Sequence, residues 1–199
     1  MLPCERTQDM LIRCDWCKGD PAYTDYHDKE WGVPLHDDRR LFEMLVLEGA
    51  QAGLSWLTIL KKRDAYRKAF GNFDIETVAS YTESDVKRLL ADEGIVRNRR
   101  KVESAIANGR AVVRIIERYG SLDAFLWRYV DQVPVQNAWK TVDQVPAESE
   151  ISRRMSRDMK QAGFSFVGPV ICYAFMQSVG MVNDHIVDCF RYHAVQQES

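Results

Sequence analysis

The stretch LEGAQAGLSW, residues 47–56, decides how the rest of the chain is interpreted. Helical spacing places Leu41, Leu45, Glu48 and Ala52 near one another on one face of a helix, and three of these four side chains are apolar. A glutamate on an apolar face costs free energy unless it is paired or bound to something. Glu48 is therefore the first candidate for a functional residue.

Trp56 adds a large flat ring just after this carboxylate. The residues between them are mostly small, which lets another molecule approach: Gly49, Ala50, Ala52 and Gly53. A carboxylate beside an aromatic ring suits a pocket for a flat ligand that is polar or cationic. The alternative is structural, because Glu48 can pair with a core arginine or cap a neighbouring helix. The spacing leaves both interpretations open.

Composition describes an ordinary globular protein with one well-buried core. The chain has 199 residues, of which 46% are hydrophobic and 28% are charged. Its net charge of −2 argues against a surface that is basic throughout, so binding to nucleic acid requires locally concentrated positive charge. The chain carries five cysteines and shows no secretory signal, from which we expect a cytoplasmic protein in a reducing environment without disulfides.

One uncharged stretch, residues 164–183, has the length of a membrane span. It contains Gly168 followed by Pro169, and proline is common in the first turn of a helix. We therefore expect a buried core helix and no contact with a membrane. A monomer is expected, since no apolar stripe is left over.

Apolar periodicity and capping residues predict an all-α fold made of many short helices. The expected helices cover residues 21–32, 38–53, 56–70, 74–80, 82–94, 97–119, 121–129, 151–163 (capped by Ser149 or Ser152), 169–179 and 183–190. Residues 130–150 read as an irregular connector, and no alternating strand pattern is visible.

A glycine turn at Gly94 separates two of these helices, and four basic residues follow it: Arg97, Arg99, Arg100 and Lys101. Backbone N–H groups at a helix N-terminus bind anions, and the basic side chains would hold phosphates. The pattern resembles the helix-hairpin-helix motif of DNA repair proteins. The alternative is a basic face that is simply solvated.

Cysteine and histidine residues near the two chain ends form a second candidate site. His185 and Cys189 are four residues apart in the last expected helix, and Cys14 and His27 lie near the N-terminus. Two cysteines and two histidines make a complete tetrahedral set for Zn²⁺. The rival is the pair Cys14 and Cys17, which alone can form a redox couple or half of a different zinc site.

Taken together, these residues are similar to the bacterial DNA-3-methyladenine glycosylase I family. The matching runs are Cys14-Asp15-Trp16, YHDKEWGVP (26–34), LFEMLVLEGAQAGLSW (41–56), GIVRNRRK (94–101), GFSFVG (163–168), CYAFMQSVGMVNDH (172–185) and Cys189. They extend over nearly the whole chain, and the combination is highly specific. The resemblance implies a helix-hairpin-helix glycosylase fold in which structural zinc joins the two ends.

Residue by residue, the resemblance assigns two sites. The implied zinc ligands are Cys14, His27, His185 and Cys189, which leaves Cys4, Cys17 and Cys172 as free thiols. The implied base pocket is lined by Glu48, Tyr26 and Trp56, with Tyr23 and Trp16 beside them. As a whole, residues 1–199 form one glycosylase unit: a loose leader (1–13), a zinc-linked terminal region (14–36 and 150–199) and a helical hairpin region (37–149).

The implied activity is removal of 3-methyladenine from double-stranded DNA, with the free base as product. The alkylated base carries a positive charge, so its glycosidic bond is already weakened, and the enzyme has to extrude the nucleotide and recognise the base. Aromatic faces contribute about 0.5–2 kcal/mol each toward a cationic ring. We expect a monofunctional hydrolase in which Glu48 acts on the base.

Several roles stay open in the sequence. No catalytic aspartate can be assigned, because Asp184 adjoins an implied zinc ligand and the resemblance does not support it. Gln51 and Leu54 are candidates for the side chain that fills the gap left by the extruded base. Two rival classes are a DNA-binding module without catalysis, and a zinc or redox regulatory protein that uses Cys14 and Cys17.

Overall fold

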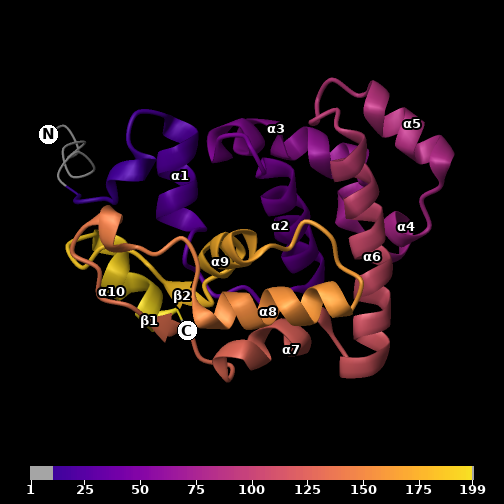
Figure 1. Cartoon of the computed structure of the whole chain (residues 1–199). Coiled ribbons are helices and arrows are strands. Elements are labelled where there is room, and N and C mark those ends of the chain that lie inside the picture. The colour runs from indigo at the N-terminus through magenta and orange to yellow at the C-terminus, as the bar shows by residue number, and fades with distance from the viewer. Residues whose placement is uncertain (1–10, 199) are drawn as a thin grey trace, which may run out of the picture.

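The computed structural model describes residues 11–198 and is built largely of short helices (Figure 1). The helices are α1 (Pro21–Lys29), α2 (Asp38–Gln51), α3 (Trp56–Ala69), α4 (Ile75–Ala79), α5 (Glu83–Ala91), α6 (Arg99–Tyr119), α7 (Leu122–Trp127), α8 (Glu150–Gln161), α9 (Pro169–Ser178) and α10 (Phe190–Gln197). Single 3-10 turns lie at Asp15–Cys17, Gly71–Phe73, Arg128–Val130 and Val142–Gln144. The prediction of a predominantly helical fold is confirmed. The leader, apart from residues 11–13, lies outside the described residues.

Side-chain caps set where the helices begin. Asp37 Oδ1 accepts a hydrogen bond of 2.8 Å from the Arg40 amide, and Ser55 Oγ accepts one of 3.2 Å from the Thr58 amide. At the start of α5, Thr82 and Asp85 form a capping box, in which the Thr82 amide donates to Asp85 Oδ2 at 3.0 Å. Of these caps, Ser55 lies at the turn between α2 and α3 and fixes the helix start at Trp56.

Helix α2 is the centre of the core. All residues from 41 to 50 are buried, and the helix packs against α3, α6, α7 and α9. A helix buried on every side is normally apolar throughout, so its two glutamates need an explanation. Glu43 has one, because its Oε1 lies 2.8 Å from Arg63 Nε and 2.9 Å from Arg67 Nη2.

Two glycines bring the ends of the chain together. Gly180, after α9, has a φ of +73°, and a Cβ atom there would lie 2.4 Å from the carbonyl carbon of Val33. Gly32, after α1, has a φ of +80°, and its Cβ would lie 3.1 Å from His185 Nε2. Only glycine fits such backbone approaches at a positive φ. In Figure 1, α1, α10 and the strands accordingly gather on one side of the molecule.

A small parallel sheet corrects the expectation of an all-α fold. Strand β1 (Val135–Gln136) pairs with β2 (Val182–Asn183), with Val135 opposite Val182 and Gln136 opposite Asn183. Each strand has two residues, which is too short to show an alternating pattern, and the pairing partners are distant in sequence. The sheet attaches the predicted irregular connector to the segment that follows α9.

The predicted helix over residues 183–190 is wrong. That segment contains the end of β2 and a loop, and α10 begins only at Phe190. His185 and Cys189 therefore lie in a loop, not on one helical face as their spacing suggested. Within residues 11–198, no helix combines the length and the apolar character that crossing a membrane requires.

Candidate functional site

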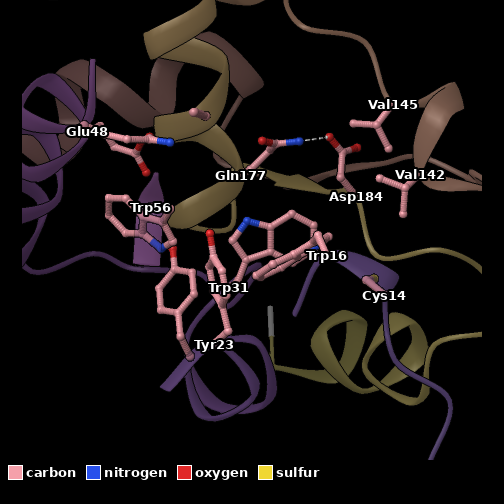
Figure 2. Close-up of a pocket in the computed structure, with 13 residues that line it drawn as sticks. Cys14, Trp16, Tyr23, Trp31, Glu48, Trp56, Val142, Val145, Gln177 and Asp184 are labelled. Carbon is pink, nitrogen blue, oxygen red and sulfur yellow. Dashed lines mark hydrogen bonds between the residues drawn. The ribbon is translucent and has the colours of Figure 1, made fainter. Parts of the chain in front are cut away.

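A cavity of about 330 Å³ opens between α1, α2, α9 and the connector (Figure 2). Its lining consists of Cys14, Trp16, Tyr23, Tyr26, Trp31, Glu48, Gln51, Trp56, Val142, Val145, Ala174, Gln177 and Asp184. The structure thus places all five residues of the predicted base pocket around one cavity.

Glu48 reaches this cavity from the buried face of α2. It is 4% exposed, and burial raises the pKa of its carboxyl to about 8, an effect that the Ser178 hydroxyl offsets in part. The nearby core arginine, Arg63, pairs with Glu43 and Glu30 instead. Among the described residues no basic side chain forms an ion pair with Glu48, so its carboxyl is available to a ligand.

Aromatic rings form the walls beside Glu48. The ring centroids of Tyr26 and Trp56 lie 5.5 Å apart, and those of Trp16 and Trp31 lie 5.0 Å apart. The Tyr23 hydroxyl accepts a hydrogen bond of 3.2 Å from the Leu57 amide, which fixes the start of α3 against α1. These contacts hold several flat faces in place around a space the size of a small planar molecule.

The indole Nε1 of Trp56 adds an unpaired donor. It is buried and finds no hydrogen-bond acceptor within residues 11–198. A buried donor without a partner costs free energy, and an acceptor on a bound ligand would remove that cost.

The sequence did not assign the other lining residues to the base pocket. Cys14 was expected only as a metal ligand and Gln51 only as a residue that fills the gap in the DNA. Six further residues of the lining had no predicted place in it: Trp31, Val142, Val145, Ala174, Gln177 and Asp184. Asp184 had appeared badly placed, but pairing of β1 with β2 carries it to the wall of the cavity. Helical spacing from Ala174 to Gln177 was the one signal that could have indicated the α9 side of the wall.

The predicted metal ligands converge at one buried point. The ligand atoms of Cys14, His27, His185 and Cys189 all lie within 4.8 Å of one another. The hydrogen bond from the Cys14 thiol, together with those from the imidazoles, lowers the pKa of Cys189, and the same bond and burial raise the pKa of Cys14. Cysteine binds a metal ion as the thiolate, so a cysteine whose pKa is lowered is suited to be a ligand.

Each histidine of this cluster has one ring nitrogen directed at a cysteine and the other fixed by an acceptor. His27 Nε2 lies 3.4 Å from Cys189 Sγ, and its Nδ1 lies 2.7 Å from Asp28 Oδ1. His185 Nδ1 lies 3.6 Å from Cys189 Sγ, and its Nε2 lies 3.0 Å from the Trp31 carbonyl oxygen. Metal-binding histidines are oriented in this way, so the cluster fits a tetrahedral metal ion.

Cys17 does not belong to this cluster. Its thiol donates to the Cys14 carbonyl oxygen at 3.1 Å, and burial raises its pKa to about 11. A thiol with a raised pKa is a poor nucleophile, which speaks against the redox interpretation of the Cys14 and Cys17 pair.

The basic hairpin is present as α5, a turn and α6. At Gly94 a Cβ atom would lie 2.7 Å from the Cβ of Ala65, so the glycine lets the turn pack against α3. The Gly94 amide donates to Asp92 Oδ1 at 2.7 Å and the Val96 amide donates to the Tyr66 hydroxyl at 3.2 Å. Both amides are therefore engaged within the protein.

The basic side chains of the hairpin have unequal environments. Lys101 Nζ donates to two carbonyl groups at the end of α2, and Arg99 Nη1 lies 3.1 Å from Glu83 and 3.0 Å from Glu103. Arg97 makes only a long contact of 3.5 Å with Glu93, and the Arg100 guanidinium lies 6.0 Å from the centroid of the Phe166 ring. Arg97 and Arg100 are the members of this set with the weakest ties within the protein.

Comparison with known proteins gives a consistent result. The family model for methyladenine glycosylases matches residues 16–192. The chain is 46% identical to DNA-3-methyladenine glycosylase 1 of Escherichia coli, covering 92% of this chain and 97% of that protein. It is 42% identical to DNA-3-methyladenine glycosylase of Haemophilus influenzae, covering 90% and 97%.

A solved structure shares the fold as well. A variant of 3-methyladenine DNA glycosylase I in complex with 3-methyladenine superposes with a TM-score of 0.87 at 39% identity, covering 89% of this chain and 96% of that one. The residues that the family model matches, 16–192, include the five predicted pocket residues, the hairpin and three members of the Cys/His cluster, whereas Cys14 precedes them. The chain therefore belongs to the methyladenine glycosylase family.

Proposed function

We propose that this protein is a DNA repair glycosylase that hydrolyses the N-glycosidic bond of 3-methyladenine in alkylated DNA. The observation that carries the proposal is the pocket, in which aromatic rings packed edge-to-face or tilted against one another surround the carboxyl of Glu48, which forms no ion pair with any described residue. The names of its relatives supply the substrate, because they are 3-methyladenine glycosylases.

The pocket explains how such a base would be bound. A methylated adenine within DNA is a cation, and the faces of Trp56 and Tyr26 attract a cationic ring. Glu48 accepts hydrogen bonds from the adenine edge and gives up its own proton as the cation enters. The base leaves with the bonding electrons as a neutral molecule, and water adds to the sugar carbon and releases one proton to the solvent.

The turn between α2 and α3 would contact the DNA. Leu54 lies there with 41% of its surface exposed, directly after Gly53. An exposed apolar side chain next to the pocket is suited to fill the space that an extruded nucleotide leaves in the duplex. Gln51, which lines the pocket, is the second candidate. Of the hairpin residues, Arg97 and Arg100 would hold phosphates, because the Gly94 amide, Arg99 and Lys101 are engaged with partners within the protein.

We also propose that the enzyme lacks lyase activity. A lyase of the Schiff-base type needs a lysine at the sugar, and the described lining of the cavity contains none. Lys101, which follows the hairpin, is held by backbone carbonyl groups. Trapping of a covalent enzyme–DNA adduct with borohydride would contradict this part of the proposal.

The Cys/His cluster is proposed to hold one structural Zn²⁺ ion. Cys14, His27, His185 and Cys189 supply four ligands and leave no open coordination position, which is typical of structural sites. The ion would link the segment before α1 to the loop before α10. It would thereby hold together the two walls of the pocket that these segments form.

The direct test is release of bases from methylated duplex DNA, with the products separated by chromatography. We expect wild type to release 3-methyladenine and Glu48→Gln to release it much more slowly. Glu117→Gln, an exposed position on α6 outside the pocket, is the matched control and should behave as wild type.

The rival classes give different outcomes. Binding of DNA without release of any base by folded, metal-loaded protein would favour a non-catalytic DNA-binding module. Loss of function in Cys17→Ser would favour the redox regulatory protein, whereas a glycosylase tolerates that change.

A further inference from the structure

The cavity that would bind the base carries acidic groups and no basic ones. Of its described lining residues, Glu48 and Asp184 are carboxylic acids, and neither lysine nor arginine is present. Figure 2 shows Glu48 on one side of the cavity and Asp184 on the other, with Gln177 between them. Two carboxyl groups facing one cavity without a cationic side chain indicate a site built for a cation.

Asp184 differs from Glu48 in its surroundings. Its carboxylate accepts four hydrogen bonds, two at each oxygen, although the residue is only 2% exposed. Oδ1 accepts from Asn137 Nδ2 and Trp139 Nε1, both at 2.7 Å. Oδ2 accepts from the Tyr173 hydroxyl and Gln177 Nε2, both at 2.8 Å.

These four bonds exclude one role and favour another. A carboxylate offers about four lone-pair sites, so that of Asp184 has none left to take a proton from water. All four donors are neutral, and Asp184 forms no ion pair with any basic side chain in the described part of the chain. Neutral donors stabilise a buried negative charge without cancelling its field.

The fold holds this charge in place from two directions. Asn137 and Trp139 belong to the connector, where the Asn137 amide also donates to the Asn183 carbonyl oxygen at 3.3 Å. Tyr173 and Gln177 project from α9. Because the charge is fixed before any ligand arrives, none of the ligand's binding energy is needed to orient it.

We propose that Asp184 is the fixed negative charge by which the pocket selects positively charged bases over neutral bases of the same shape. This inference rests on the proposed function, since it concerns how the base pocket distinguishes alkylated from normal adenine. Glu48 complements it: with a pKa of about 8, Glu48 is mostly protonated at neutral pH in the empty pocket, so Asp184 supplies the standing charge.

Asp184→Asn is the informative variant, because it removes the charge and keeps the shape. The asparagine oxygen can accept the bonds from Asn137 and Trp139. The Tyr173 hydroxyl can turn to accept from the new amide, and the Gln177 amide can rotate to present its oxygen. The control is Asp143→Asn, which removes the same charge from an exposed position on the same connector.

Two small probes isolate the effect of charge. The 3,9-dimethyladeninium cation carries a methyl group where DNA has the sugar, and 3,9-dimethyl-3-deazaadenine is its neutral isostere. Dissociation constants are measured by calorimetry on protein whose metal content and melting temperature are recorded. We expect wild type and Asp143→Asn both to prefer the cation. Asp184→Asn should bind the cation about tenfold more weakly and the neutral isostere almost unchanged.

The possible results separate the inference from the proposed function. An unchanged cation preference in folded Asp184→Asn overturns the inference, and so does equal weakening of both probes, which would mark a purely structural role. Equal affinity of wild type for the two probes overturns it without recourse to any variant. If wild type binds neither probe and releases no base, the proposed function fails and the inference fails with it.

Discussion

Lys101 Nζ lies 2.6 Å from the carbonyl oxygen of Ala52 and 2.8 Å from that of Ala50. The last carbonyl groups of a helix have no partner within it, and a cation near that end also opposes the negative end of the helix dipole. A residue predicted to grip DNA phosphates therefore terminates the helix that carries Glu48.

Lys101→Met is expected to destabilise the protein. The change leaves two carbonyl groups without their donor, and we expect the free energy of unfolding to fall by about 1–3 kcal/mol. Affinity for free 3-methyladenine should fall too, because α2 would lose its fixed end. Urea unfolding and calorimetric titration check both effects. Wild-type stability in this variant would show that the carbonyl contacts contribute nothing.

Arg97→Gln, unlike Lys101→Met, should leave the stability of the protein nearly unchanged. Arg97 is exposed and only weakly paired, so stability should stay within about 0.5 kcal/mol of wild type. If Arg97 contacts a phosphate, the slope of log K against log salt for duplex DNA should become shallower by about 0.9. Fluorescence anisotropy across a salt series measures this slope, and an identical slope in variant and wild type would remove Arg97 from the DNA interface.

The stability of the protein should depend on the protonation of Glu48. The pKa of this carboxyl is about 8 in the fold and 4.5 in the ordinary case. Between these values the folded state retains a proton that the unfolded chain has lost, so the free energy of unfolding decreases as pH rises. This stabilisation is fully present below pH 4.5 and is lost as the pH rises toward about 8. The loss amounts to at most about 1.4 kcal/mol per pH unit.

Glu48→Gln removes this titration. We expect its unfolding free energy, measured in urea over that pH window, to exceed that of wild type increasingly as pH rises. Binding of a cationic base should likewise release a proton, which is visible as a buffer-dependent enthalpy. Parallel pH profiles for variant and wild type would mean that Glu48 is ionised in the fold.

Removal of the proposed metal ion should loosen both chain ends. Closing a loop from residue 14 to residue 189 restricts the unfolded chain by about 4–5 kcal/mol on the chain-entropy model. We expect a chelator, or Cys189→Ser, to lower the melting temperature and abolish base release together. Cys17→Ser is the control and should retain one metal ion per chain by elemental analysis. Full metal content in Cys189→Ser would be incompatible with the proposed ligand set.

Leu54→Ala should separate DNA distortion from base recognition. Leu54 is exposed and does not line the cavity, so free 3-methyladenine should bind as to wild type. Excision from duplex DNA should slow by about tenfold to a hundredfold, because unstacking a base costs a few kcal/mol. Val170→Ala, at another exposed apolar position, serves as the control. Equal loss of both activities would place Leu54 in the pocket itself.

The sequence predicted the helices well because caps and apolar periodicity are local. Thr82 with Asp85, Ser55 and Asp37 mark helix starts that the structure contains. The Cys/His cluster was also predicted, although one of its supporting arguments was wrong. His185 and Cys189 meet through a loop before α10, and their spacing of four residues only imitates a helical face.

What the sequence missed depends on contacts between distant segments. Asp184 appeared to be only the neighbour of a metal ligand, because its four donors come from the connector and from α9. The strands that bring Asp184 to the cavity have only two residues each, which is too short to produce a periodic pattern in the sequence. Lys101 read as one member of a basic run, since nothing local indicates that its side chain reaches back to the end of α2.

The meeting of the two chain ends has a consequence for synthesis. One wall of the pocket and half of the Cys/His cluster come from residues 184–189, so a nascent chain on the ribosome holds Glu48 and its aromatic neighbours long before it can complete the site. The core around α2 can form early, but the cavity closes only when the final segment has emerged. A chain that stops before Asp184 would keep the basic hairpin and lack both one wall of the pocket and half of the Cys/His cluster. Activity thus requires that synthesis has passed residue 189.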